Sequence, residues 1–124
     1  MRPKKHYFTF QELTITDTGL ANLPYSMEHV ENLNMLSLVL SLAREKFGAP
    51  ICVNSAFRTP DVNARVKGSK NSYHLQGLAA DIRPNYYPAH EYESELVRLA
   101  KCLTDLNYKF KEFIVYPTFI HVAV

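Results

Sequence analysis

An aspartate lies inside an apolar run, and a histidine stands at the entrance to that run, in residues 71–82, NSYHLQGLAADI. Burying an unpaired carboxylate costs several kcal/mol, so Asp81 needs a compensating partner or access to water. An ion pair with Arg58 or Arg83, exposure at a strand end, or a bound cation would each meet that need. At this point the three explanations stay open.

Metal binding is an option because two histidines accompany this aspartate. His74 precedes Asp81 across a glycine-containing loop that could fold both side chains toward one point, and His121 lies in the terminal run FIHVAV. Two histidine nitrogens and one carboxylate are typical of catalytic zinc sites, which keep a further position open for water. A histidine in an apolar strand is, however, more often a satisfied core residue than a ligand. A metal-free hydrogen-bonded cluster of the three side chains is therefore the alternative.

Helix signals flank these residues on both sides. Thr9 stands three residues before Glu12, which is the spacing of a capping box and predicts a short helix. The spacing of apolar residues predicts a long helix over residues 27–47 that ends at Gly48. The same kind of spacing predicts another amphipathic helix within residues 88–107.

The segments between these helices have strand or loop character. Residues 51–57, ICVNSAF, indicate a buried strand, and Thr59 then caps a short helix that we expect to reach Val66. A polar loop that contains His74 leads into a strand at residues 78–82, LAADI. The ending FKEFIVYPTFIHVAV supplies two β-rich runs around a proline, which form either one bent strand or a hairpin.

This order of elements predicts an α+β fold. Helices come first and strands follow unevenly, without βαβ alternation, so we expect a small, mainly antiparallel sheet flanked by helices. The chain has 124 residues and 47% hydrophobic content, enough for one core, and we expect a single domain over residues 1–124. The two cysteines, Cys52 and Cys102, do not imply a disulfide framework, and we expect both to be buried thiols.

Charge and hydropathy narrow the classes of partner. The formal net charge is only +2, and Lys and Arg are scattered, so nucleic acid is not an expected partner. No apolar segment approaches the ~20 residues that a membrane span needs. The opening MRPKKHYFTFQEL has no apolar core of the kind found in signal peptides. We expect a monomer that has no membrane span and is cytoplasmic as synthesised.

The stretch around the His74 loop resembles a known family. Similarity to the core of the zinc D-alanyl-D-alanine peptidases, the M15 peptidase family, extends over SAFRTPDVNARVKGSKNSYHLQGLAADI. The family pattern Ser-x-His-x-x-Gly-x-Ala-x-Asp is matched by SYHLQGLAADI, and the terminal segment by FIHV. The resemblance covers most of the chain and is to the short phage-type and bacterial members. The family shares its fold with the hedgehog signalling domain. The resemblance implies one zinc, held by His74, Asp81 and His121.

The same resemblance implies cleavage of peptidoglycan stem peptides beside a D-amino acid, by a carboxypeptidase or an endopeptidase. Arg58 matches the family arginine that anchors a substrate carboxylate or stabilises the oxyanion, roles that suit a forked guanidinium. The alternative for Arg58 is an ion pair with Asp61. Ser72 matches the motif serine and would bind substrate or orient a ligand. A phage-type enzyme would reach the cell wall after release from the cell.

One element of the family pattern is missing from this chain. Amide hydrolysis needs a carboxylate that takes a proton from the attacking water, and in relatives it lies three or six positions before the last ligand histidine. Those positions are Thr118 and Val115 here. Glu112 is the nearest upstream acid, nine positions before His121, and it could reach the metal only if the interruption at residues 116–118 redirects the strand. We expect it instead to be a solvated strand residue beside Lys109 and Lys111.

Other groups could take the place of the missing acid. Tyr116 is one candidate, and remote acids such as Glu91 or Glu93 are others, but the sequence selects none of them. A second hypothesis follows from the same gap. The protein would be a non-catalytic module that keeps the zinc and binds cell-wall peptide or a protein partner.

Overall fold

A small sheet and several helices make up the protein in the computed structural model, which describes residues 2–85 and 88–124. The helices are α1 (Phe10–Leu13), α2 (Met27–Phe47), α3 (Pro60–Arg65), the 3-10 helix η1 (Tyr73–Gln76) and α4 (Ala89–Asp105). The strands are β1 (Ile51–Ser55), β2 (Ala79–Pro84), β3 (Glu112–Val115) and β4 (Ile120–Ala123). All pairings in the sheet are antiparallel, in the order β1-β2-β4-β3. The expected α+β fold is confirmed.

Local capping signals explain where α1 begins and where α2 begins and ends. Thr9 and Glu12 form the expected capping box at α1. The Ser26 side chain accepts the His29 N–H at the start of α2, and Gly48 ends that helix in the left-handed conformation, with φ of 75°. The bounds of α2 agree with the prediction. The caps that set these bounds are next to the helix in the sequence, so they depend only on local signals.

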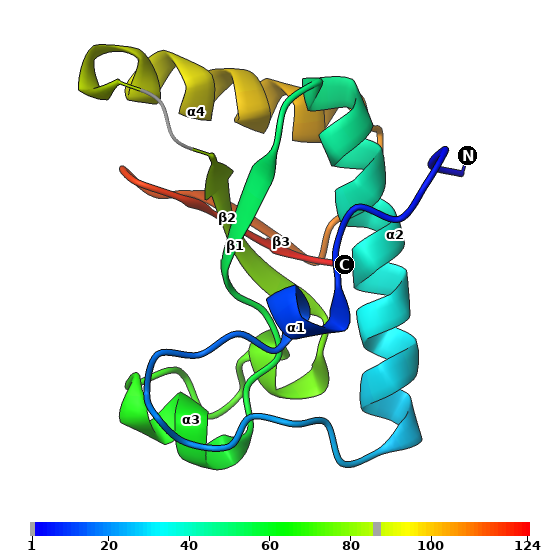
Figure 1. Cartoon of the computed structure of the whole chain (residues 1–124), viewed down its shortest axis with the longest axis vertical. Coiled ribbons are helices and arrows are strands. Elements are labelled where there is room, and N and C mark those ends of the chain that lie inside the picture. Colours follow the sequence, from blue (N-terminus) through cyan, green and yellow to red (C-terminus); the bar gives the residue numbers. More distant parts are fainter. Residues whose placement is uncertain (1, 86–87) are drawn as a thin grey trace.

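The hydrophobic core lies between the helices and one face of the sheet. Figure 1 shows α2 running beside the sheet and α4 crossing one end of it. Fully buried side chains from α2, α4 and the sheet meet in one cluster, among them Leu36, Leu40, Ile82, Leu99, Leu103 and Ile120. The helices therefore cover the apolar face of the sheet.

The register of the sheet determines what lies on its other face. One row of paired residues crosses all the strands and consists of Ser55, Asp81, His121 and Ile114. Side chains alternate between the two faces along a strand, so Asp81 and His121 point away from the buried Ile82 and Ile120. Polar residues from separate strands thus share the face opposite the helical core.

The C-terminal segment is a hairpin, which settles the choice between a bent strand and a hairpin. β3 and β4 pair across a turn in which the Tyr116 N–H donates to the Phe119 carbonyl at 2.8 Å. Pro117 lies in this turn, where its missing N–H removes no ladder bond. The expected strand at residues 51–57 is shorter than predicted, since β1 ends at Ser55.

The two cysteines are free, but the expectation that both are buried is wrong. Both are partly exposed. Cys52 alternates with the buried Ile51 and Val53 on β1, so its side chain points away from the core, and its Sγ lies 3.2 Å from Asn85 Oδ1. Cys102 packs at the margin of the core cluster.

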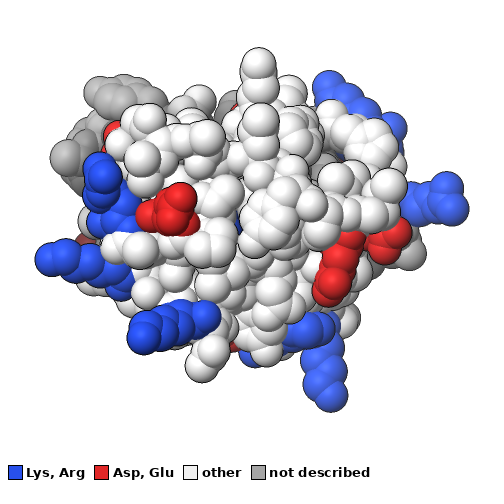
Figure 2. Space-filling view, turned by 90° about the horizontal axis from the view of Figure 1, so that it is seen from below, with Lys and Arg blue, Asp and Glu red and all other residues white. Residues whose placement is uncertain are grey.

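The surface carries mixed charge. Figure 2 shows one face of the molecule, on which Lys and Arg side chains are spread around the edge and acidic side chains lie among them. This face therefore has no single basic patch. None of the helices in residues 2–85 and 88–124 combines the length and apolar character that a membrane span requires.

Candidate metal centre and pocket

The 3-10 helix η1 holds His74, which was expected in a loop. The Ser72 side chain caps η1 by accepting the His74 N–H at 3.1 Å, and Gly77 ends it. The His74 carbonyl accepts the Arg58 N–H at 3.0 Å, which ties the turn to the segment after β1. His74 is only 3% exposed, so its ring has a fixed, buried position.

Gly77 must be glycine for two reasons, and we expect Gly77→Ala to destabilise the fold. Its φ is +77°, and an added Cβ would lie 3.2 Å from the His29 carbonyl oxygen and from Leu33 Cγ. The left-handed backbone alone costs an L-residue about 1–2 kcal/mol. Gly19 is the matched control, because its φ is +79° but no described atom lies within 4 Å of an added Cβ.

Chemical denaturation in the presence of EDTA measures this effect. Gly19→Ala is expected to lose only the backbone contribution, and Gly77→Ala is expected to lose more. Equal losses in the two variants would mean that the close approach of Gly77 to α2 contributes nothing.

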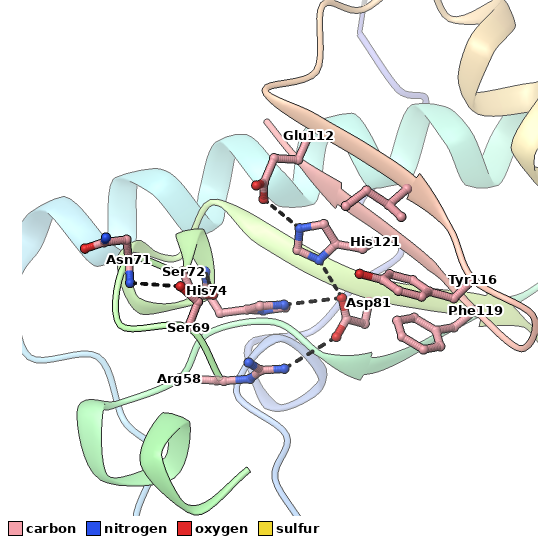
Figure 3. Close-up of a pocket in the computed structure, with 11 residues that line it drawn as sticks. Arg58, Ser69, Asn71, Ser72, His74, Asp81, Glu112, Tyr116, Phe119 and His121 are labelled. Carbon is pink, nitrogen blue, oxygen red and sulfur yellow. Dashed lines mark hydrogen bonds and ion pairs between the residues drawn. The ribbon is translucent and has the colours of Figure 1, made fainter. Parts of the chain in front are cut away.

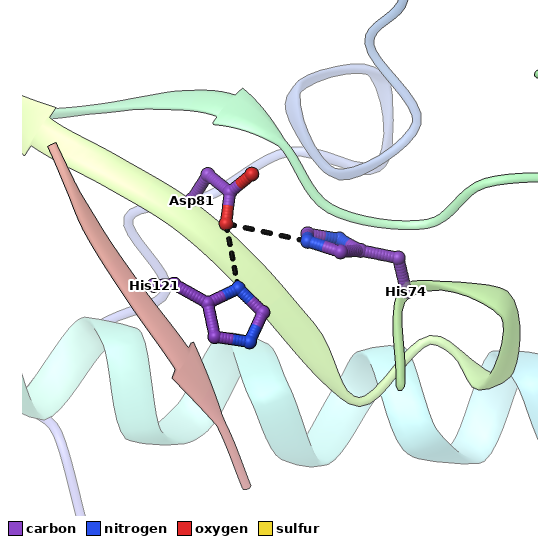
Figure 4. Close-up of side chains that lie close together, drawn as sticks. All are labelled: His74, Asp81 and His121. Atoms are coloured by element: carbon purple, nitrogen blue, oxygen red, sulfur yellow. Dashed lines mark hydrogen bonds and ion pairs between the residues drawn. The ribbon is translucent and has the colours of Figure 1, made fainter. Parts of the chain in front are cut away.

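His74, Asp81 and His121 meet on the polar face of the sheet (Figure 4). Asp81 Oδ1 lies 3.2 Å from His74 Nε2 and 2.8 Å from His121 Nδ1. One ligand atom from each residue lies within 4.8 Å of the other two. η1 supplies the first side chain, and paired positions on β2 and β4 supply the others. The structure therefore brings together the three residues that the sequence suggests as metal ligands.

This donor set suits zinc. Zinc takes imidazole nitrogen and carboxylate oxygen, and a site with three protein ligands keeps one position open. His74 Nδ1 lies 2.6 Å from the Ala56 carbonyl oxygen, which accepts a hydrogen bond from Nδ1–H. Nε2, which faces Asp81, is therefore the nitrogen that can bind a metal once it carries no proton. Metal-binding histidines are commonly oriented by such a contact at the other ring nitrogen. The three side chains therefore fit a zinc ion.

Asp81 is held ionised by its neighbours. Burial raises the pKa of its carboxyl group, but hydrogen bonds from His121 and His74 and the charges of the two rings outweigh burial and hold the pKa well below its usual range. Oδ2 also lies 3.4 Å from Arg58 Nη2. Arg83 bonds Asn54 instead, and the Asp81 side chain is only 13% exposed. Asp81 therefore has protein partners in both histidines and in Arg58, and it is neither paired with Arg83 nor exposed at a strand end.

The hydrogen bond to Asp81 also raises the pKa of His121, against the opposing effect of burial. Glu112 raises this pKa further through a second hydrogen bond and its charge. The imidazole of His121 thus lies between two carboxylates, one at each ring nitrogen.

Arg58 is fixed in place beside Asp81 by further contacts. Its Nε donates to Ser55 Oγ at 3.0 Å, and its Nη1 donates to Asn63 Oδ1 at 3.2 Å. An added Cβ at Gly68 would lie 2.9 Å from Arg58 Nη1, so the neighbouring loop packs closely against this guanidinium. Burial lowers the pKa of Arg58, and the negative charge of Asp81 opposes that effect. A guanidinium stays charged in proteins. The ion pair suggested with Asp61 is replaced by one with Asp81.

These side chains line a pocket of about 300 Å³. Figure 3 shows Arg58 on one side of the histidine–aspartate cluster and Glu112 on the other, with Tyr116 and Phe119 facing Ser72 across the pocket. The rings of Tyr116 and Phe119 are stacked, with centroids 4.7 Å apart. The pocket is open to a ligand that contacts the cluster and Arg58 together.

Glu112 lies in a strand and is partly exposed, as expected, but it also contacts His121. Its Oε1 lies 2.8 Å from His121 Nε2, and its side chain is 41% exposed. The turn at residues 116–118 redirects the chain, which was the condition for Glu112 to approach the cluster, and the hairpin lays β3 beside β4. Among the other candidates, Tyr116 belongs to the described lining of the pocket, but Glu91 and Glu93 do not.

Comparisons with known proteins assign the chain to a family. The sequence model of a family described as Peptidase M15 matches residues 6–123. The chain belongs to the peptidase M15 family. This M15 family member also resembles, in its structure, the crystal structure of Serratia marcescens L-Ala D-Glu endopeptidase ChiX, at 17% identity, 88% coverage of this chain, 95% coverage of that chain and a TM-score of 0.48. None of the curated proteins matches the chain.

Proposed function

We propose that the protein is a zinc-dependent peptidase that cleaves peptidoglycan stem peptides next to a D-amino acid, as a carboxypeptidase or an endopeptidase. The observation that carries this proposal is the convergence of His74, Asp81 and His121 beside a pocket that also contains Arg58. Membership of a peptidase family supports peptide-bond cleavage. The motif resemblance supports the choice of substrate.

Each side chain has a part in this proposal. Zinc at the cluster would polarise the scissile carbonyl and activate water as the nucleophile. Arg58 has five N–H groups, and the described acceptors use one on each of its nitrogens, which leaves a second N–H on both terminal nitrogens. Those donors suit a substrate carboxylate or a developing oxyanion. Ser72 orients His74 through the cap of η1 and lines the pocket.

A second candidate is a binding module that retains the zinc and holds cell-wall peptide without cleaving it. The observation in its favour concerns the proton acceptor. The carboxylates in the described lining of the pocket are Asp81 and Glu112, and both already face histidine nitrogens. General acid–base assistance is worth about 10²- to 10⁴-fold. If the protein lacks a free proton acceptor, any peptide cleavage by it should be slower than in a complete enzyme by about that factor.

Incubation of the zinc-loaded protein with purified muropeptides separates the two candidates. The appearance of new amines, with masses that identify the cleaved bond, would support the peptidase. Calorimetry on the same muropeptides measures binding. Affinity without cleavage would favour the binding module, and the absence of both would contradict both candidates.

Metal removal should lower stability. A ligand that binds only the native state adds about 4 kcal/mol to the free energy of unfolding at 1,000 times its dissociation constant. We therefore expect excess zinc to raise the melting temperature of EDTA-treated protein and EDTA to reverse the rise. The His74→Ala variant is the control, since it lacks one ligand, and its melting curve should not respond to zinc. Identical curves for the wild type with zinc and with EDTA would contradict a zinc site.

A further inference from the structure

We infer that Glu112 is a positioning residue for the zinc site. Its carboxylate accepts the Nε2–H of His121 and thereby directs Nδ1 of that ring toward the metal. The contact that carries this inference is the 2.8 Å separation between Glu112 Oε1 and His121 Nε2. The inference rests on the proposed function, because it takes the metal to lie among His74, Asp81 and His121.

The hairpin creates this contact. His121 pairs with Ile114 across β3 and β4, and Glu112 pairs with Ala123. Glu112 and His121 are therefore diagonal neighbours on one face of the sheet, a separation that long side chains can bridge. The side chain of Ala123, directly opposite Glu112, is a single methyl group, which leaves the carboxylate room to turn toward the imidazole.

Hydrogen bonding then selects which nitrogen of each ring is free. An ionised carboxylate only accepts hydrogen bonds, so Glu112 holds a proton at Nε2 of His121. Nδ1 then becomes the free nitrogen when a metal replaces the proton that it shares with Asp81. In His74 the Ala56 carbonyl accepts a hydrogen bond from Nδ1–H, which leaves Nε2 as the nitrogen available to a metal. The two nitrogens selected in this way, His121 Nδ1 and His74 Nε2, are the ones that approach Asp81 Oδ1. Two separate contacts thus aim both rings at one point.

The same geometry argues against Glu112 as the proton acceptor for the attacking water. Nδ1 and Nε2 flank Cε1 and their bonding directions diverge, so a carboxylate bonded to Nε2 points away from a ligand held at Nδ1. Loss of a supporting partner of this kind typically costs 10–100-fold in metal affinity.

The test is the affinity of the full chain for Zn²⁺, measured by competition with a chromophoric chelator. Glu112→Ala is expected to weaken binding by about 10–100-fold. Glu112→Gln keeps an oxygen that can accept the Nε2–H, so it should weaken binding less. Glu31→Ala is the control, because it removes an exposed carboxylate from α2, away from the pocket, and should bind as tightly as the wild type.

A spectroscopic measurement isolates the positioning role from general stability. Two-bond ¹H–¹⁵N spectra of the zinc-loaded wild type should show His121 with zinc at Nδ1 and a proton at Nε2. That proton should exchange faster with water in Glu112→Ala. If Glu112→Ala does not fold, the affinity of Glu112→Gln and the wild-type spectrum decide the matter.

The outcomes distinguish this inference from the proposed function. A wild type that binds no zinc would overturn both. A wild type that binds zinc, with unchanged affinity in both Glu112 variants, would overturn the inference alone. Coordination through His121 Nε2 would also overturn it. Unchanged affinity together with loss of cleavage in both variants would assign Glu112 to proton transfer instead.

Discussion

Replacing any one of His74, Asp81 or His121 with alanine is expected to abolish retention of zinc through dialysis, with a loss of affinity larger than the 10–100-fold that a supporting hydrogen bond contributes. Each side chain supplies one of three ligand atoms that lie within 4.8 Å of one another. A site reduced to two protein ligands no longer matches the ligand count of catalytic zinc centres. Elemental analysis after dialysis measures the result, with one zinc per chain expected in the wild type.

His90→Ala is the matched control, because it removes an exposed histidine on α4 and should leave zinc content unchanged. Asp81 also pairs with Arg58, so its removal can affect folding as well as zinc. Asp81→Asn keeps the shape of the side chain and serves as a second variant at that position. Equal zinc in the wild type and in all variants of the three positions would rule out this site.

Substitution of Arg58 by lysine is expected to reduce cleavage of muropeptides by about 10²- to 10³-fold, the cost of losing an oxyanion-hole donor. Lysine keeps the charge but loses the planar fork that binds two oxygens at once. The native guanidinium is held by Ser55, Asn63 and Asp81, which fixes the direction of its remaining donors. A flexible ammonium group in the same place would have no such fixed direction.

The control for this substitution is Arg83→Lys. Arg83 is an arginine of strand β2, but it bonds Asn54 and is not part of the described lining of the pocket. Zinc content and melting temperature are measured alongside activity. Wild-type cleavage and binding by a folded, zinc-containing Arg58→Lys protein would show that Arg58 takes no part in substrate handling. A large fall in melting temperature with full activity of the folded protein would make its role structural.

Much of the local structure could be predicted because its signals lie within a few residues of the feature that they determine. The capping box at Thr9 and the glycine after Phe47 mark helix ends, where side-chain and backbone hydrogen bonds are made to near neighbours. The motif around His74 and Asp81 likewise indicated the candidate ligands and the family, since ligand chemistry depends on residue type. Burial of His74 in η1 was not predicted, because the polar residues around it in the sequence are also typical of a loop.

Pairing between strands, in contrast, was decided only by the tertiary structure. The sequence left open whether the last two β-rich runs form a hairpin, and that choice determines whether Glu112 is remote from His121 or bonded to it. It also left open which arginine pairs with Asp81, and packing against Ser55 and Asn63 places Arg58 there. By itself the sequence determined the residue types that can bind a metal and the helices around them. The direction in which each ring nitrogen points depends on contacts between residues far apart in the chain, for which no local pattern exists.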